Sequence, residues 1–115
     1  MKITIDALEA YLAHCYKGAG DDHGLFMKLV EEVGEIAEVL NKRTGRKKSD
    51  GTDPTEQLGL ELADLVHYAV AIAAVNGIDL ERVILEKDRR AAVKYHHDVD
   101  LESFIQRGVK ESASK

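Results

Sequence analysis

Cysteine and proline are scarce in this sequence, and strand signals are missing. Cys15 is the one cysteine among 115 residues, which excludes an intramolecular disulfide and a zinc site built from cysteines. Pro54 is the one proline, and no stretch shows the period-two alternation or the β-branched density of a strand. These absences favour an all-helical chain.

An excess of basic charge is also missing. The formal net charge is −5 at pH 7, whereas a nonspecific nucleic-acid binder carries a basic face. We therefore expect no nucleic-acid partner. An acidic protein can still bind an anionic substrate if metal ions supply the positive charge.

Long uninterrupted hydrophobic runs are absent as well. Residues 1–6 contain no apolar segment of the kind that starts a secretory signal. The most apolar run, residues 62–75, is interrupted by Asp64 and His67 and is shorter than a bilayer-spanning segment. These features predict a cytoplasmic protein without a membrane partner.

The remaining bulk properties are those of one soluble globular domain. The chain has 115 residues, of which 44% are hydrophobic and 32% are charged, and this length supports a single hydrophobic core. We predict one domain over residues 1–115.

Hydrophobic spacing predicts four helices. Their expected limits are Ile5 to Tyr16, Leu25 to Arg43, Glu56 to Asn76, and Leu80 to Tyr95. Thr55 and Asp79 are the expected caps of the third and fourth helices, and Gly77 is a typical stop after the third. Residues 96–115 carry a weak helical pattern followed by a polar end.

The second predicted helix contains an unusual cluster of acids. Four glutamates fall within eight residues: Glu31, Glu32, Glu35 and Glu38. They occupy an arc of roughly 120° beside the apolar stripe, and like charges three or four residues apart destabilise a helix. Such a run is commonly a solvated face, and neutralisation by a bound cation is the alternative.

The third predicted helix supplies complementary acids. Residues 62–75 are apolar nearly all round, as in a helix buried on most sides, yet Glu61 and Asp64 lie one turn apart at its start. Glu61 alone is explained by the preference for acids near a helix N-terminus. A buried, ionised Asp64 needs a partner. Carboxylate pairs on two facing helices offer oxygen-only ligation, which suits Mg²⁺ or Mn²⁺.

The two acidic segments together are similar to a known motif. Glu31-Glu32-x-x-Glu35, followed by Glu61-x-x-Asp64, resembles the MazG-like, all-α nucleotide pyrophosphatase superfamily. The resemblance covers about Phe26 to Lys94, the motif core, and leaves residues 96–115 as a C-terminal tail. It implies an all-α fold, a four-helix MazG-like bundle completed by oligomerisation into a dimer or tetramer.

The resemblance also implies an activity. Members hydrolyse nucleoside or deoxynucleoside triphosphates to a monophosphate and pyrophosphate with Mg²⁺, for which Mn²⁺ can substitute, commonly in nucleotide-pool housecleaning. It assigns the metal ligands to Glu32, Glu35, Glu61 and Asp64. Glu31 matches the first glutamate of the motif and has a supporting or water-activating role, so the catalytic candidates are Glu31 and Glu35.

Basic residues complete the site that the resemblance implies. The expected phosphate-binding residues are Lys28, Lys87, Arg90 and Lys94. The family often has an asparagine where this chain has Ala91, and Arg90 is a possible substitute. A solvated basic helix face is the alternative for these residues.

Other readings of the sequence stay open at this stage. The departure at Ala91 allows a non-catalytic helical module that binds a nucleotide or a metal. Asp64-x-x-His67 resembles half of a di-iron site, and His96-His97-Asp98 is a second possible metal group. The basic segment 42–48 is either solvated or a lid over the triphosphate.

Overall fold

The structure is a computed structural model that describes residues 1–18, 21–44 and 53–113, with side chains as far as Gly108. The elements in these ranges are α1 (Ile5–Cys15), α2 (His23–Arg43), α3 (Pro54–Val75), α4 (Leu80–Lys94) and α5 (Leu101–Ala113). No strand occurs in them, which confirms the predicted all-α class. The weak helical pattern predicted within residues 96–115 forms a fifth helix, α5.

Local signals explain where the helices begin and end. Asp79 caps α4 as predicted, since its Oδ1 accepts a hydrogen bond from the backbone N–H of Arg82 at 3.2 Å. The predicted cap of α3 at Thr55 is wrong. Asp53 takes this role by accepting from the Thr55 N–H at 3.0 Å, and Pro54 occupies the first helical position, where a missing N–H costs nothing.

The C-terminal end of α3 is a glycine-dependent turn. Gly77 has a φ of 66°, and the N–H of Ile78 donates to the carbonyl of Ala73 at 3.0 Å. This pairing is a Schellman motif, which requires a left-handed residue at the glycine position. The Asn76-Gly77 stop predicted from the sequence is confirmed.

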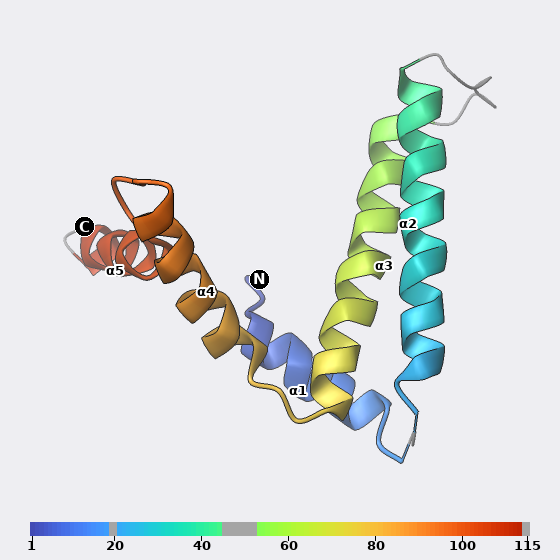
Figure 1. Cartoon of the computed structure of the whole chain (residues 1–115), viewed down its shortest axis with the longest axis horizontal. Helices are drawn as coiled ribbons and strands as arrows, with labels where there is room; N and C mark the ends of the chain where they lie inside the picture. The colour runs from blue at the N-terminus through green and yellow to red at the C-terminus, as the bar shows by residue number, and fades with distance from the viewer. Residues whose placement is uncertain (19–20, 45–52, 114–115) are drawn as a thin grey trace. The chain divides into compact units, whose positions relative to one another are not determined.

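The first compact unit, residues 1–78, is built on an antiparallel pair of helices. Figure 1 shows α2 and α3 side by side, with α1 packed against α3. Leu12 of α1, Val39 of α2 and Val70 of α3 are each at most 2% exposed. Each of the three helices thus contributes a buried apolar side chain to its packing against a neighbour.

The second compact unit, residues 79–115, contains α4 and α5. Ala92 of α4 is buried, and the carboxylate of Asp88 accepts a hydrogen bond from the backbone N–H of Leu101 at 2.6 Å. This bond satisfies one of the free N–H groups at the start of α5. The assignment of residues 1–115 to one domain stays a prediction.

Much of α3 is exposed in the single chain, contrary to expectation. Leu60, Leu62 and Val66 are 63%, 43% and 45% exposed, and only 17% of its most apolar window is buried. The apolar run was predicted to be too short to span a membrane, but the helix that contains it has 22 residues. By length and composition alone, this helix could cross a membrane. Core helices of soluble proteins pass the same test.

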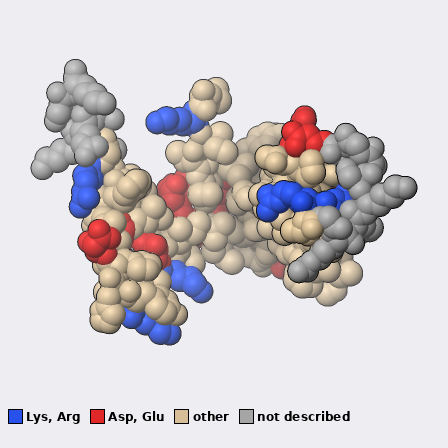
Figure 2. Space-filling view, turned by 90° about the horizontal axis from the view of Figure 1, so that it is seen from above, with Lys and Arg blue, Asp and Glu red and all other residues tan. Residues whose placement is uncertain are grey.

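Basic side chains gather at the surface near the loop end of the α2–α3 pair (Figure 2). Lys42 and Arg43 lie in the last turn of α2, where cations interact favourably with the helix dipole. Residues 45–48 of the basic segment lie outside the described residues, so the lid over a triphosphate stays a prediction.

Candidate functional site

Glu32 occupies a core position of α2. Leu25, Leu29, Ile36 and Val39 recur around it at the three- and four-residue spacing of a buried helix face. The side chain is therefore carried against α3, where the residue is only 8% exposed. A carboxylate in this position requires a hydrogen-bond donor or a cation.

Three acids from the two helices converge. One carboxylate oxygen each from Glu32, Glu61 and Asp64 lies within 4.8 Å of the others. Glu35, one turn along α2, lies beside the group, because its carboxyl is the largest cause of the raised pKa of Glu61. The structure thus brings together the four residues that were predicted as metal ligands, all within the first unit.

Electrostatics in this cluster favour a proton or a cation. Hydrogen bonds from Glu61 to Glu35 and then to Glu32, followed by burial and the charges of both neighbours, raise the pKa of Glu61 to about 8. Glu32 Oε2 and Glu61 Oε2 are buried and have no hydrogen-bond partner. Orphaned carboxylate oxygens beside further acids fit a hard divalent cation such as Mg²⁺ or Mn²⁺.

The protonation of Glu61 predicts how stability depends on pH without metal. The ordinary pKa of this carboxyl is 4.5 and the folded-state value is about 8, so the folded state binds more protons than the unfolded state between these limits. This contribution to stability is complete below about pH 4.5 and is lost as the pH rises through about 8. In EDTA, the melting temperature should therefore fall between about pH 5.5 and about pH 8.5.

Glu61→Gln is the matched variant for this prediction, because its amide stays neutral and can still donate a hydrogen bond. Its melting temperature in EDTA should vary less with pH over the same range, as measured by circular dichroism. Equal pH slopes for wild type and Glu61→Gln would show that the proton is not held at Glu61.

Asp64 corrects an expectation about burial. The residue is exposed in the single chain, whereas the apolar neighbours in its own helix suggested a buried carboxylate. Its neighbours Leu62 and Val66 are exposed as well. The buried acid of the cluster is Glu32, and its position in the apolar period of α2 is the signal that would have identified it.

Glu31 and Lys28 lie apart from the buried acids. Both are exposed, and Lys28 Nζ forms an ion pair with Glu31 Oε2 at 3.4 Å. The two residues lie one turn apart on α2 and both side chains are solvated, so the ion pair contributes little to stability. The roles predicted for Glu31 in catalysis and for Lys28 in phosphate binding stay predictions.

The predicted phosphate-binding residues of α4 share one face of that helix. Lys87, Arg90 and Lys94 are spaced by three and four residues. No ion pair involves them among the described side chains. Arg82, elsewhere on α4, is by contrast paired with Glu86 at 3.4 Å.

His67 is engaged outside the carboxylate cluster. Its Nε2 is hydrogen-bonded to the hydroxyl of Tyr16 at 2.7 Å, and the metal-ligand cluster found in the described part of the chain contains carboxylates alone. This arrangement gives no support to a di-iron site through Asp64 and His67, or to a metal site at His96 and His97.

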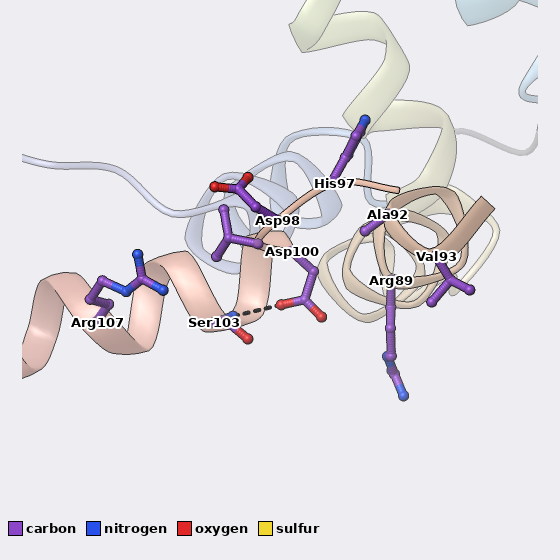
Figure 3. Close-up of a pocket in the computed structure, with 9 residues that line it drawn as sticks. Arg89, Ala92, Val93, His97, Asp98, Asp100, Ser103 and Arg107 are labelled. Carbon is purple, nitrogen blue, oxygen red and sulfur yellow. Dashed lines mark hydrogen bonds between the residues drawn. The ribbon is translucent and has the colours of Figure 1, made fainter. Parts of the chain in front are cut away.

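An open cavity of about 330 Å³ lies in the second unit, between the end of α4 and the start of α5 (Figure 3). Its charges are mixed. Asp100 accepts from the Ser103 N–H at 2.9 Å, and this bond, with a smaller contribution from Arg89, lowers the pKa of Asp100. Arg89 and Arg107 point in different directions in Figure 3, so the cavity does not concentrate positive charge.

Comparison with known proteins connects the carboxylate cluster to a family. Residues 22–97 match the model of the MazG nucleotide pyrophosphohydrolase domain, and this range contains all four clustered acids.

Individual relatives agree with this match. Human dCTP pyrophosphatase 1 is 41% identical over 66 residues, which are 55% of this chain and 39% of that protein. The rat dCTP pyrophosphatase 1 is 38% identical over 66 residues, with the same coverage. An uncharacterised Bacillus subtilis protein, YpjD, is 27% identical over 81 residues, covering 70% of this chain and 73% of its own length. The chain spans about two fifths of the length of the dCTP pyrophosphatases that it matches. Because the family model matches residues 22–97, the chain belongs to the MazG nucleotide pyrophosphohydrolase family.

Proposed function

We propose that this protein hydrolyses nucleoside triphosphates to a monophosphate and pyrophosphate, with Mg²⁺ held by Glu32, Glu35, Glu61 and Asp64. The convergence of Glu32, Glu61 and Asp64, with oxygens within 4.8 Å, carries this proposal. Two buried oxygens of the cluster lack hydrogen-bond partners, which is the condition that a divalent cation relieves.

The chemistry requires positioning and charge neutralisation more than covalent catalysis. Bound Mg²⁺ would polarise the phosphoryl oxygens and lower the pKa of a nearby water. Glu35 is exposed at the edge of the cluster, where its carboxylate can accept a proton from the attacking water. Glu31 is the second candidate for this base. The α–β anhydride bond breaks, and the two products are the monophosphate and pyrophosphate.

The basic face of α4 is the proposed contact for the phosphates. Lys87, Arg90 and Lys94 are exposed and have no acidic partner in the described structure. Cations without an acidic partner are available for charge-assisted hydrogen bonds to phosphate oxygens. Lys28 is the further candidate on α2, although its ion pair with Glu31 must open first.

Neutralising these cations should weaken substrate binding. Lys87→Ala and Lys94→Ala should each raise the KM for the triphosphate roughly tenfold, the equivalent of one charge-assisted contact of about 1.4 kcal/mol. Arg82→Ala is the matched control on the same helix, because Arg82 is paired with Asp79 and Glu86. Steady-state kinetics with saturating Mg²⁺ provide the measurement. A KM unchanged in both lysine variants would remove α4 from the substrate site.

The nucleobase is tested with a panel of substrates. The named relatives are dCTP pyrophosphatases, so we propose dCTP as the first candidate, with dUTP, other deoxynucleotides and damaged nucleotides as alternatives. The protein is incubated with each triphosphate and Mg²⁺, and the products are separated by ion-exchange chromatography. Monophosphate and pyrophosphate support the proposal, whereas a diphosphate with inorganic phosphate would contradict it.

A non-catalytic binding module is the second candidate function. Ala91 lies on the same α4 face as Lys87 and Lys94, and it cannot form the hydrogen bonds of the asparagine expected there. Binding of a triphosphate without release of pyrophosphate would select this alternative.

We also propose that a second copy of the chain covers the apolar surface of α2 and α3. Val30 and Val33 of α2 are 46% and 52% exposed, and Leu62 and Val66 of α3 are 43% and 45% exposed. Apolar patches of this kind commonly mark interfaces, and closed dimers or tetramers are the usual assemblies. Light scattering should give a molar mass of two or four times that of the 12.7 kDa chain, and the mass of a single chain would contradict the proposal. A cytoplasmic housecleaning role goes with this proposal.

A further inference from the structure

The rotation of α3 about its own axis is weakly specified by hydrophobic packing. Val70 and Ala73 are buried, yet Leu62 and Val66, which lie on the same side of α3 and are equally apolar, are exposed. A helix that is apolar nearly all round can present several faces to a neighbour at similar energy, because uniform apolar packing specifies a unique arrangement poorly. Repulsion among the clustered carboxylates opposes the face that is observed.

Tyr16 and His67 provide a directional contact on another face of α3. The Tyr16 hydroxyl and His67 Nε2 are 2.7 Å apart across 51 residues of sequence, and both side chains are half-buried. The rings of Tyr16 and His67 meet edge to face with centroids 5.8 Å apart, and the Tyr68 ring meets His67 edge to face at 5.0 Å. His67 lies one turn after Asp64, so a bond that orients His67 also orients the acids of the same helix.

A second long-range hydrogen bond fixes the position of α3 along its axis. Asn76 Nδ2, at the end of α3, donates to Asp22 Oδ2 at the start of α2 at 2.9 Å. The same amide donates to the carbonyl of Ile72 at 2.8 Å. The segment that joins α1 to α2 is therefore tied to α3 at two places, Tyr16 and Asp22.

We propose that Tyr16 and His67 are positioning residues, whose hydrogen bond holds α3 in the rotation that turns Glu61 and Asp64 toward Glu32. The pair stays outside the metal cluster and acts through the helix. The role in metal binding rests on the proposed function of that cluster. Burial raises the pKa of Tyr16, so its hydroxyl stays protonated.

The orientation of α3 is measured without metal. Spin labels are placed at Ala37 of α2 and Ala69 of α3, both exposed, in a Cys15→Ser chain diluted with unlabelled protein. Pulsed electron resonance should give a narrow distance distribution for the parent protein. Tyr16→Phe removes only the hydroxyl and should broaden or shift that distribution. Tyr11→Phe, the same change at a 62% exposed tyrosine of α1, should not.

Metal affinity gives the functional readout. Tyr16→Phe and His67→Leu should weaken Mn²⁺ binding several-fold, while the apo melting temperature of Tyr16→Phe stays close to that of Tyr11→Phe. His67→Gln keeps a polar group facing the hydroxyl and should restore part of the affinity. A purely structural pair would lower the melting temperature without a selective loss of metal.

The outcomes separate the two proposals. A parent protein that binds no Mn²⁺ would remove the metal site, and the label distances would still decide the positioning role. Distances in Tyr16→Phe identical to those in Tyr11→Phe would overturn the positioning role, whatever the metal affinity. A change in distance together with weaker Mn²⁺ binding supports it.

Discussion

Glu35→Gln and Asp64→Asn each reduce turnover roughly 100-fold or more, because each removes a negative oxygen from the place where the cation is held. Glu35 raises the pKa of the neighbouring Glu61, and Asp64 contributes an oxygen to the convergent group. Both residues are exposed, so the amide variants should fold normally. Initial rates with dCTP and Mg²⁺ provide the measurement.

Glu56→Gln is the matched control for these variants. It changes an exposed acid in the first turn of α3, on the same helix as Asp64 but outside the convergent group, and should leave the rate within about twofold. Normal turnover in both Glu35→Gln and Asp64→Asn would place the active site elsewhere.

Removal of metal has the second large effect. EDTA should abolish activity, because the carboxylates alone cannot neutralise a triphosphate. Mg²⁺ at about 100 times its Kd adds about 2.7 kcal/mol to the free energy of unfolding, which raises the Tm by roughly 10 °C in a domain of this size. The ion also displaces the proton of Glu61, so its affinity should increase with pH.

Thermal melts with Mg²⁺, with EDTA, and with NaCl at matched ionic strength distinguish site binding from screening. Glu32→Gln, which alters the buried acid, should lose most of the Mg²⁺ gain. Full activity in excess EDTA, or the same gain from NaCl, would contradict the metal site.

The helices were predictable because their signals are local. The spacing of apolar residues in α2, the cap at Asp79 and the stop at Gly77 all depend on neighbours within a few residues. The start of α3 was placed too late because Asp53 and Thr55 are both good caps, and Pro54 is accepted at the first helical position. The length of α5 was not predicted, because its apolar pattern rests on Leu101, Phe104 and Ile105.

That acids from α2 and α3 come together was predictable, whereas their burial was not. Helical spacing indicated two acid-bearing faces, and the family resemblance implied Glu32, Glu35, Glu61 and Asp64 as the ligands. The structure brings oxygens of Glu32, Glu61 and Asp64 together. Apolar neighbours were taken as evidence that Asp64 is buried, but the neighbours are themselves exposed in the single chain. Glu32→Gln, which replaces the buried acid, should therefore stabilise the apo protein by about 1 kcal/mol.

Contacts between distant residues left no trace in the sequence. Tyr16 and His67 are 51 residues apart, and Asp22 and Asn76 are 54 residues apart. No local spacing pairs them, because each bond depends on how α1 and α2 lie against α3. The sequence suggested Asp64 as the neighbour of His67 in a di-iron resemblance, whereas its hydrogen-bond partner in the structure is the Tyr16 hydroxyl.

The most direct test of the central claim is to locate the metal. Crystals soaked in Mn²⁺ should show an anomalous difference peak between α2 and α3, at about 2.0–2.3 Å from oxygens of Glu32, Glu61 and Asp64. A peak at His96 and His97 instead, or no peak at a Mn²⁺ concentration that supports full activity, would contradict the account.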